Sequence, residues 1–191
     1  LDPVPRVLRQ YPEKDTSLEA RYARAIAYYR KPDLRNALPL IDGLIAERPD
    51  DPYFHELRGQ MLFENARIID SLPSYLRAVE LLPNNGLLRT ELAHAMLETG
   101  EPSLIAPAIE HLEDARRLDT RLPLALRLLA VGYGRQEDFG MSARYSAEFA
   151  LKTGKIDDAI GQADKAIRLL PAGSVARRQA QDIKQEAENL K

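Results

Sequence analysis

The chain contains no cysteine, so it cannot form a disulfide, a thiolate metal site or a cysteine nucleophile. It also lacks any run near the roughly 18 consecutive apolar residues that a membrane-spanning helix requires. The formal net charge is only -2, and lysine and arginine form no dense run. The sequence therefore gives no electrostatic reason to expect a nucleic acid or an anionic lipid surface as partner.

What is present is an ordinary globular composition. Hydrophobic residues make up 45% and charged residues 29% of a chain of 191 residues, which is long enough to bury a sizeable core. The stretch from Leu1 to Tyr11 lacks the basic start and apolar middle of a signal peptide. Because the sequence starts at Leu1 and not at methionine, we expect it to be a piece of a longer protein, with any secretion signal upstream.

A repeated segment is the strongest signal in the sequence. Ile45 to Asp51 (IAERPDD) is similar to Val79 to Asn85 (VELLPNN), and their prolines, Pro49 and Pro83, are 34 residues apart. This is the period of tetratricopeptide repeats (TPRs), each of which is a pair of helices. One such pair cannot bury its apolar stripe alone, so neighbouring pairs stack and share a continuous core.

The register set by these prolines divides the chain into repeats. We expect a lead-in segment over residues 1–17 and a TPR domain over residues 18–191. The predicted repeats are 18–51, 52–85 and 86–122, followed by an extra helix over 123–136, a repeat-like pair over 140–173 and a capping helix over 174–190. The helix from Met141 to Lys152 has to serve as the second helix of one pair and the first of the next, so its pairing stays open. The sequence predicts an all-α fold, a TPR α-α superhelix (a right-handed solenoid of antiparallel helix pairs) with a C-terminal capping helix.

Small residues and prolines recur at fixed places in this register. Position 8, where two helices touch most closely, holds Ala25, Gly59 and Ala93. Pro39 and Pro73 share another position, which we expect near the first turn of the second helix, where a proline costs little or kinks the helix mildly.

Residues that could carry chemistry are few. The run His55-Glu56-Leu57-Arg58-Gly59 begins like the zinc-protease motif His-Glu-x-x-His, but glycine replaces the second histidine that would complete the zinc site. His94 and His111 belong to different predicted helices and make a poor set of metal ligands. No serine has a histidine at an interpretable spacing. We therefore predict no catalytic residue, no cofactor and no metal ion in this chain.

A partner-binding groove is the remaining kind of site. In tetratricopeptide arrays the concave groove is lined mainly by positions 2, 5, 9, 12 and 13 of each first helix, a property of the family that the register transfers to this chain. The candidate groove residues are Tyr22, Ile26, Tyr29, Arg30, Tyr53, Glu56, Gln60, Phe63, Glu64, Thr90, His94, Leu97, Arg127, Val131 and Arg135. They lack the Lys/Arg/Asn set that clamps a C-terminal carboxylate in chaperone-binding TPR domains, so we expect an extended or helical apolar segment as ligand. The alternative is that Tyr22, Tyr29 and Phe63 belong to the core between repeats.

Longer runs add a resemblance to one family. They are YPEKDTSL at 11–18, ARYARAIAYYR at 20–30, PYFHEL at 52–57 with GQMLFE at 59–64, and DAIGQA at 158–163. Together these runs resemble the C-terminal TPR region of bacterial BepA-like zinc metallopeptidases (peptidase family M forty-eight), over nearly the whole chain. The resemblance implies a periplasmic location, and an N-terminal peptidase domain that carries the zinc site outside this sequence.

These observations lead us to expect a non-catalytic protein-protein interaction module that holds a protein or peptide in its groove. The resemblance implies that the module docks substrates or partners for the peptidase, with the outer-membrane assembly machinery as a possible partner, in outer-membrane protein assembly or quality control. Two alternatives stay open. The chain could associate with copies of itself through its terminal helix or an uncovered repeat edge, or it could pack on its own N-terminal peptidase domain and regulate access to that domain's active site.

Overall fold

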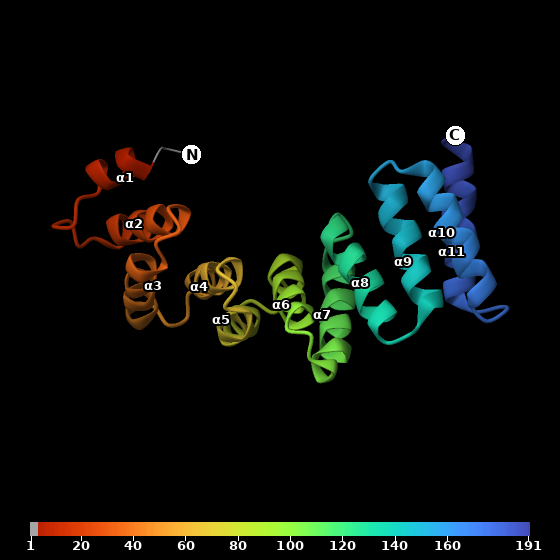
Figure 1. Ribbon diagram of the computed structural model, residues 1–191, viewed down its shortest axis with the longest axis horizontal. Coiled ribbons are helices and arrows are strands. Elements are labelled where there is room, and N and C mark those ends of the chain that lie inside the picture. The colour runs from red at the N-terminus through yellow and green to blue at the C-terminus, as the bar shows by residue number, and fades with distance from the viewer. Residues whose placement is uncertain (1–3) are drawn as a thin grey trace. The chain divides into compact units, whose positions relative to one another are not determined.

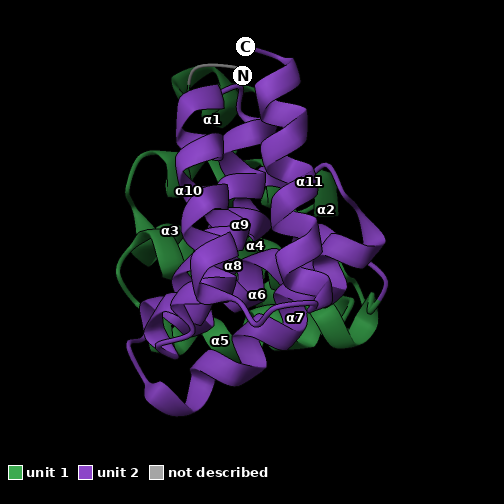
Figure 2. Cartoon of the chain, turned by 90° about the vertical axis from the view of Figure 1, so that its right-hand side faces the viewer, with its two compact units in different colours: residues 1–83 green, residues 84–191 purple. Residues whose placement is uncertain are grey.

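The computed structural model describes residues 4–191, which form helices and no strands (Figure 1). The helices are α1 (Val4–Gln10), α2 (Leu18–Arg30), α3 (Leu34–Glu47), α4 (Pro52–Glu64), α5 (Ile68–Leu81), α6 (Gly86–Glu98), α7 (Ile105–Leu118), α8 (Pro123–Arg135), α9 (Phe139–Lys152), α10 (Ile156–Leu169) and α11 (Val175–Asn189), with one turn of 3-10 helix, η1 (Pro102–Leu104), before α7. The chain divides into two compact units at Pro83 (Figure 2). Unit 1 contains α1 to α5, and unit 2 contains α6 to α11.

The starts of three helices follow the period of the sequence. Ser17, Asp51 and Asn85 are spaced 34 residues apart, and each lies one residue before a helix. The side-chain oxygen of each accepts a hydrogen bond from a backbone N–H in the first turn, at 3.3 Å for Ser17 and 3.0 Å for Asp51. These N-caps satisfy backbone donors that have no partner inside the helix, so the period of the sequence sets where α2, α4 and α6 begin.

Unit 1 is built from two helix pairs, α2 with α3 and α4 with α5, and α3 also packs on α4. Its core includes Ala25, Ala37, Ile41, Leu44, Phe54 and Met61. A Cβ atom added to Gly59 would lie 2.9 Å from a ring carbon of Tyr75 on α5. Glycine at this position therefore allows α4 and α5 to approach closely.

The segment before α2 is tied to unit 1 by one buried arginine. Arg24 of α2 is only 4% exposed, and its Nη1 donates hydrogen bonds to the backbone oxygens of Pro12 (2.6 Å) and Asp15 (2.8 Å). Residues 1–3 of the predicted lead-in segment lie outside the described residues. From residue 4 onward, the segment contains α1 and a turn that closes on this arginine.

Pro39 and Pro73 lie deeper in their helices than the sequence indicated. Each occupies the second turn, because α3 begins at Leu34 and α5 at Ile68. A proline nitrogen cannot donate to the carbonyl four residues earlier, which belongs to Arg35 in α3 and Ile69 in α5. Both of these residues are exposed, so water can bind the carbonyl groups left without a helical partner.

Unit 2 continues the alternation of helices, and α9 packs on three of them. In this unit α6 packs on α7, α7 on α8, and α9 on α8, α10 and α11 (Figure 1). The helix whose pairing the sequence left open is therefore paired on both sides. Small residues make this possible, because three layers of buried side chains join α9, α10 and α11. The layers are Ala143 with Ala166 and Ala180, Ala147 with Ala163 and Ile183, and Ala150 with Ala159 and Ala187.

Residues 4–191 contain no helix with both the length and the apolar character needed to cross a membrane.

Candidate functional site

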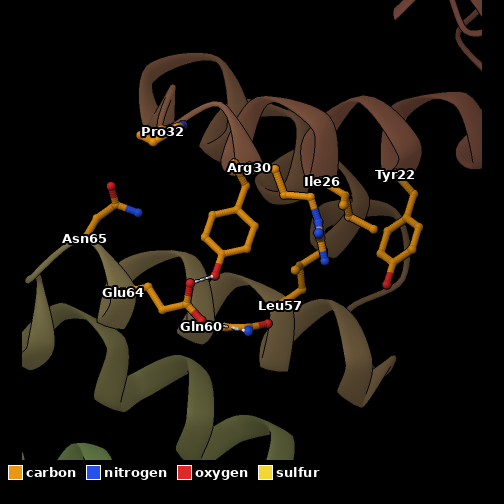
Figure 3. A pocket seen from close by; sticks show the side chains of 9 residues that line it. Tyr22, Ile26, Arg30, Pro32, Leu57, Gln60, Glu64 and Asn65 are labelled. Atoms are coloured by element: carbon orange, nitrogen blue, oxygen red, sulfur yellow. Dashed lines mark hydrogen bonds between the residues drawn. The ribbon is translucent and has the colours of Figure 1, made fainter. Parts of the chain in front are cut away.

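A cavity of about 620 Å³ lies between α2 and α4 in unit 1, and Figure 3 shows it from close by. We call it the α2–α4 groove. Its lining residues are Tyr22, Ile26, Tyr29, Arg30, Pro32, Leu57, Gln60, Glu64 and Asn65. Six of the predicted groove residues, four on α2 and two on α4, thus lie around one cavity. The four on α2 have the spacing of one helical face.

The groove is crossed by a polar contact between its two helices. The hydroxyl of Tyr29 on α2 donates a hydrogen bond to Oε2 of Glu64 on α4, and Nε2 of Gln60 donates to Oε1 of the same carboxylate at 2.9 Å (Figure 3). Burial, and next the bond to Glu64, raise the pKa of Tyr29 well above its usual range. Tyr29 is therefore a protonated donor at neutral pH, and both oxygens of Glu64 are engaged.

The opposite end of the groove is less polar. Figure 3 shows Tyr22, Ile26 and Leu57 gathered there, with the Arg30 side chain between Ile26 and Leu57, away from Glu64 and Asn65. The ring of Tyr22 packs on Phe54 at 5.7 Å between centroids, and burial, followed by the nearby Glu56 carboxylate, raises the pKa of the Tyr22 hydroxyl. Burial also raises the pKa of Glu56.

The remaining predicted residues of unit 1 lie elsewhere. Phe63 meets Tyr75 edge to face at 6.4 Å, so it packs between α4 and α5, as the alternative core interpretation has it. Tyr53 is 53% exposed at the start of α4, beside the loop that contains Pro49 and Asp50.

In unit 2, two of the predicted groove residues are buried instead of accessible. Thr90 and Leu97 are each 1% exposed, and the Thr90 hydroxyl donates to the Gly86 carbonyl at 2.8 Å. The reason is that α6 packs on both α7 and α8, which enclose the face that the position rule assigns to the groove. His94 is partly buried on the same helix, and this burial lowers its pKa.

The three predicted residues of α8 have different surroundings. Arg127 and Val131 are exposed, whereas Arg135 donates a hydrogen bond to the backbone oxygen of Leu97 at the end of α6. Arg135 thus ties α8 to α6, which gives it a structural contact besides any contact with a ligand.

Sequence reasoning missed a second cavity, of about 360 Å³, between α9 and α11 in unit 2. We call it the α9–α11 hollow. From α9 it is lined by Arg144, Glu148, Leu151 and Lys152. If Gly140 is position 1 of a repeat, these residues occupy positions 5, 9, 12 and 13, the groove positions used for the earlier repeats. The signal was therefore present in the sequence, in the repeat-like pair over 140–173.

The zinc-protease-like run of α4, residues 55–59, makes contacts that belong to the packing of unit 1. Nε2 of His55 is hydrogen-bonded to the backbone oxygen of Pro49 at 2.8 Å, and Gly59 is the contact point with Tyr75. Within residues 4–191 no three or more histidine, aspartate or glutamate side chains are grouped as a metal site would require.

Comparisons with known proteins identify the fold. No protein-family model matches the chain, and no curated protein sequence matches it. Among solved structures, "MamA 41-end from Desulfovibrio magneticus RS-1" is similar with a TM-score of 0.68 and 18% identity, over 80% of this chain and 84% of that one. "MamA MSR-1 C2" has a TM-score of 0.60 and 16% identity, over 96% of this chain and 86% of that one. A thermophilic TPR protein of Thermus thermophilus has a TM-score of 0.52 and 17% identity, over 87% of this chain and 98% of that one.

At such identities the likeness shows the fold alone. It confirms the fold class that the 34-residue period predicted, because the neighbours include a named TPR protein and residues 4–191 form helices without strands. The chain has the all-α fold of a TPR α-α superhelix.

Proposed function

We propose that this chain is a protein-interaction module that binds a segment of another polypeptide in the α2–α4 groove. The carrying observation is that six residues at the groove positions of the TPR register surround one cavity of about 620 Å³. This volume is in the range of pockets that bury a drug-sized ligand, roughly 300–1,000 Å³, which is also room for a few side chains. TPR likeness supports the proposal as an analogy of fold, and the lining residues carry it.

The lining favours a ligand with two kinds of side chain. An apolar side chain fits the end formed by Tyr22, Ile26 and Leu57, where water would be displaced from apolar surface. A polar group of the ligand, or its backbone, faces Asn65 at the other end, or the Arg30 guanidinium, which lies beside Ile26 and Leu57 (Figure 3). The Glu64 carboxylate accepts hydrogen bonds from Tyr29 and Gln60, so the three side chains hold one another in place in the absence of a ligand.

Site-specific crosslinking tests the proposal. A photoreactive amino acid placed at Arg30 or at Glu64, both exposed on the groove, should capture the same polypeptide partner. The matched control is the same amino acid at Ile69, which is 69% exposed on α5 and outside the groove. An Ile26→Glu substitution should abolish capture at Arg30, because a charge would enter the apolar end of the groove. Capture from Ile69 alone, or undiminished capture by the Ile26→Glu variant, would refute the groove.

We further propose, from the sequence resemblance, that the module serves a BepA-like zinc metallopeptidase in the periplasm, where it docks substrates or partners during outer-membrane protein assembly or quality control. The support is the set of matching runs at 11–18, 20–30, 52–64 and 158–163. The natural sequence upstream of Leu1 tests this idea. A His-Glu-x-x-His motif on a predicted helix there would support it, and an upstream sequence without such a motif would refute it.

A further inference from the structure

The α9–α11 hollow is lined by charges of both signs. Arg116 of α7 and Arg144 and Lys152 of α9 are its cationic residues, and Glu148 of α9 lies next to both arginines. The exposed residues Asp182 and Glu186 of α11 line the other side. Leu151 of α9 adds apolar surface, to which Ile183 and Leu190 on and after α11 also contribute. The hollow thus presents guanidinium groups and apolar side chains to the same small volume.

Arg144 is the most deeply buried charged side chain of this hollow. Its side chain is 4% exposed, its guanidinium lies over the Tyr145 ring at 4.1 Å from the centroid, and its Nη2 donates to Glu148 at 2.9 Å. Its Nε is buried and has no hydrogen-bond partner within residues 4–191. An arginine side chain carries five N–H donors in a planar fork, and the Nε–H of this fork is left without an acceptor.

Arg116 has the same deficit. Its Nε is also buried without a hydrogen-bond partner in the described part of the chain, and lies 3.6 Å from the nearest Glu113 oxygen, too far for a hydrogen bond. Its Nη1 is 3.9 Å from Glu148. Arg116 and Arg144 therefore share Glu148, and neither side chain is fully satisfied by it.

The other nearby carboxylate, Glu113, is held by two tyrosine hydroxyls through one of its oxygens. Oε1 of Glu113 accepts hydrogen bonds from the hydroxyls of Tyr133, at 3.3 Å, and of Tyr145. Burial, followed by the charge of Glu113, raises the pKa of Tyr133 to about 12, so this hydroxyl stays a donor at neutral pH. The protein's own acids thus leave buried guanidinium N–H groups without acceptors, which is unfavourable in a folded protein.

We propose that the α9–α11 hollow is a second binding site, which takes a peptide segment with a carboxylate next to a branched apolar side chain. The carboxylate lies against Arg116 and Arg144, and the apolar side chain packs on Leu151, Ile183 and Leu190. Asp182 and Glu186 repel the carboxylate from α11 and thereby fix its orientation toward α9. The residues of this site belong to unit 2, so a test of this site is independent of the test of the groove proposed in unit 1.

The probe is acetyl-Leu-Glu-Leu-amide, with acetyl-Leu-Gln-Leu-amide as its uncharged match. Each is titrated into the full chain, and the NMR cross peaks of the arginine Nε–Hε groups are followed. The cross peaks of Arg116 and Arg144 should move with the glutamate peptide, which should bind about tenfold more tightly than the glutamine peptide because its hydrogen bonds are charge-assisted. N-acetylglutamate alone should bind more weakly than the peptide, because it lacks the apolar contacts.

Two variants complete the test. Arg144→Lys keeps the charge but removes the fork, and should weaken binding of the glutamate peptide about tenfold, whereas Arg168→Lys on the exposed face of α10 should change nothing. Glu186→Gln, on an exposed position that leaves the core intact, should tighten binding about twofold by removing a like charge. If Arg144→Lys unfolds, as judged by circular dichroism, Glu186→Gln decides by itself.

Three results would overturn the site itself. They are equal binding of the glutamate and glutamine peptides, absence of binding by either, and unchanged affinity in the variants that remain folded. If N-acetylglutamate binds as tightly as the peptide, the site takes a small carboxylate and the assignment of a peptide is wrong. Because none of the altered residues lies in unit 1, these outcomes leave the crosslinking test of the α2–α4 groove unaffected.

Discussion

Replacing Ala66 or Glu137 by glycine should stabilise the protein, although glycine usually destabilises. Both residues follow the end of a helix and adopt the left-handed conformation, with φ of 59° at Ala66 and 62° at Glu137. The corresponding positions of two other repeats hold Gly100 and Gly154, with φ of 75° and 73°. The backbone requires this conformation, since the next residue's N–H closes onto the helix, from Asp138 to the Tyr133 oxygen at 3.0 Å for example.

The magnitude follows from two opposing effects. A side chain in the left-handed region costs about 1–2 kcal/mol. Glycine also lowers the free energy of unfolding by about 0.4–1 kcal/mol, because it increases the conformational entropy of the unfolded chain. Ala66 and Glu137 are both exposed, so the substitution removes no packing. Each glycine should therefore raise the free energy of unfolding by roughly 0.5–1 kcal/mol.

Urea unfolding followed by circular dichroism measures this change, as the shift of the midpoint at constant slope. Gly154→Ala is the reverse experiment and should lower the free energy of unfolding by about 1 kcal/mol. An added Cβ meets no atom within 4 Å, so the effect comes from the left-handed backbone conformation alone. Gly43→Ala also meets no atom within 4 Å, but lies inside α3, so it should stabilise by about 0.5–1 kcal/mol. If Gly154→Ala and Gly43→Ala had effects of the same sign, the reasoning from backbone conformation would be wrong.

Three further predictions concern the core, the lead-in segment and pH. Gly59→Ala should cost about 1–3 kcal/mol, because its Cβ would meet the Tyr75 ring at 2.9 Å; the same urea experiment checks this, and a neutral result would contradict the close approach of α4 and α5. Arg24→Ala should release the segment before α2, so hydrogen exchange of residues 4–16 should accelerate while exchange in α4 and α5 stays slow; equal protection in both proteins would count against the arginine anchor. The pKa of Tyr133 is raised to about 12, so its contribution to stability is complete below its unfolded pKa of about 10 and is lost as the pH rises from there toward 12. Tyr133→Phe should make this loss of stability less steep, and an identical pH profile in both proteins would exclude the effect.

Much of the fold could be predicted from the sequence, because the 34-residue period acts through local chemistry. Pro49 and Pro83 set the register, and the caps at Ser17, Asp51 and Asn85 follow it. The pairing of α9 could not be predicted, because its small residues allow close packing on more than one side. That is a property of tertiary structure, and it is visible only once α8, α10 and α11 are in place.

The sequence could predict which residues share one face of a helix, and the candidate site was predictable to that extent. The spacing of Tyr22, Ile26 and Tyr29 predicts that they lie on one face, and all three line the α2–α4 groove while packing against the core of unit 1. The same rule failed for Thr90 and Leu97, since a position in a repeat does not say which neighbouring helix covers it. Whether any of the groove residues binds a partner stays a prediction.

The alanine layers between α9, α10 and α11 have a consequence for helix register. Layers of nearly identical small side chains bring helix axes close together, but they discriminate poorly against a slip of one turn, because each alanine would meet another alanine. Two features break this uniformity. Ile183 is the one large side chain among the buried residues of the middle layer, and Leu170 sits so close to Gly140 that an added Cβ would lie 2.9 Å from it. Within the alanine layers, a leucine over a glycine and an isoleucine among alanines thus favour one alignment of the three helices over a slipped one.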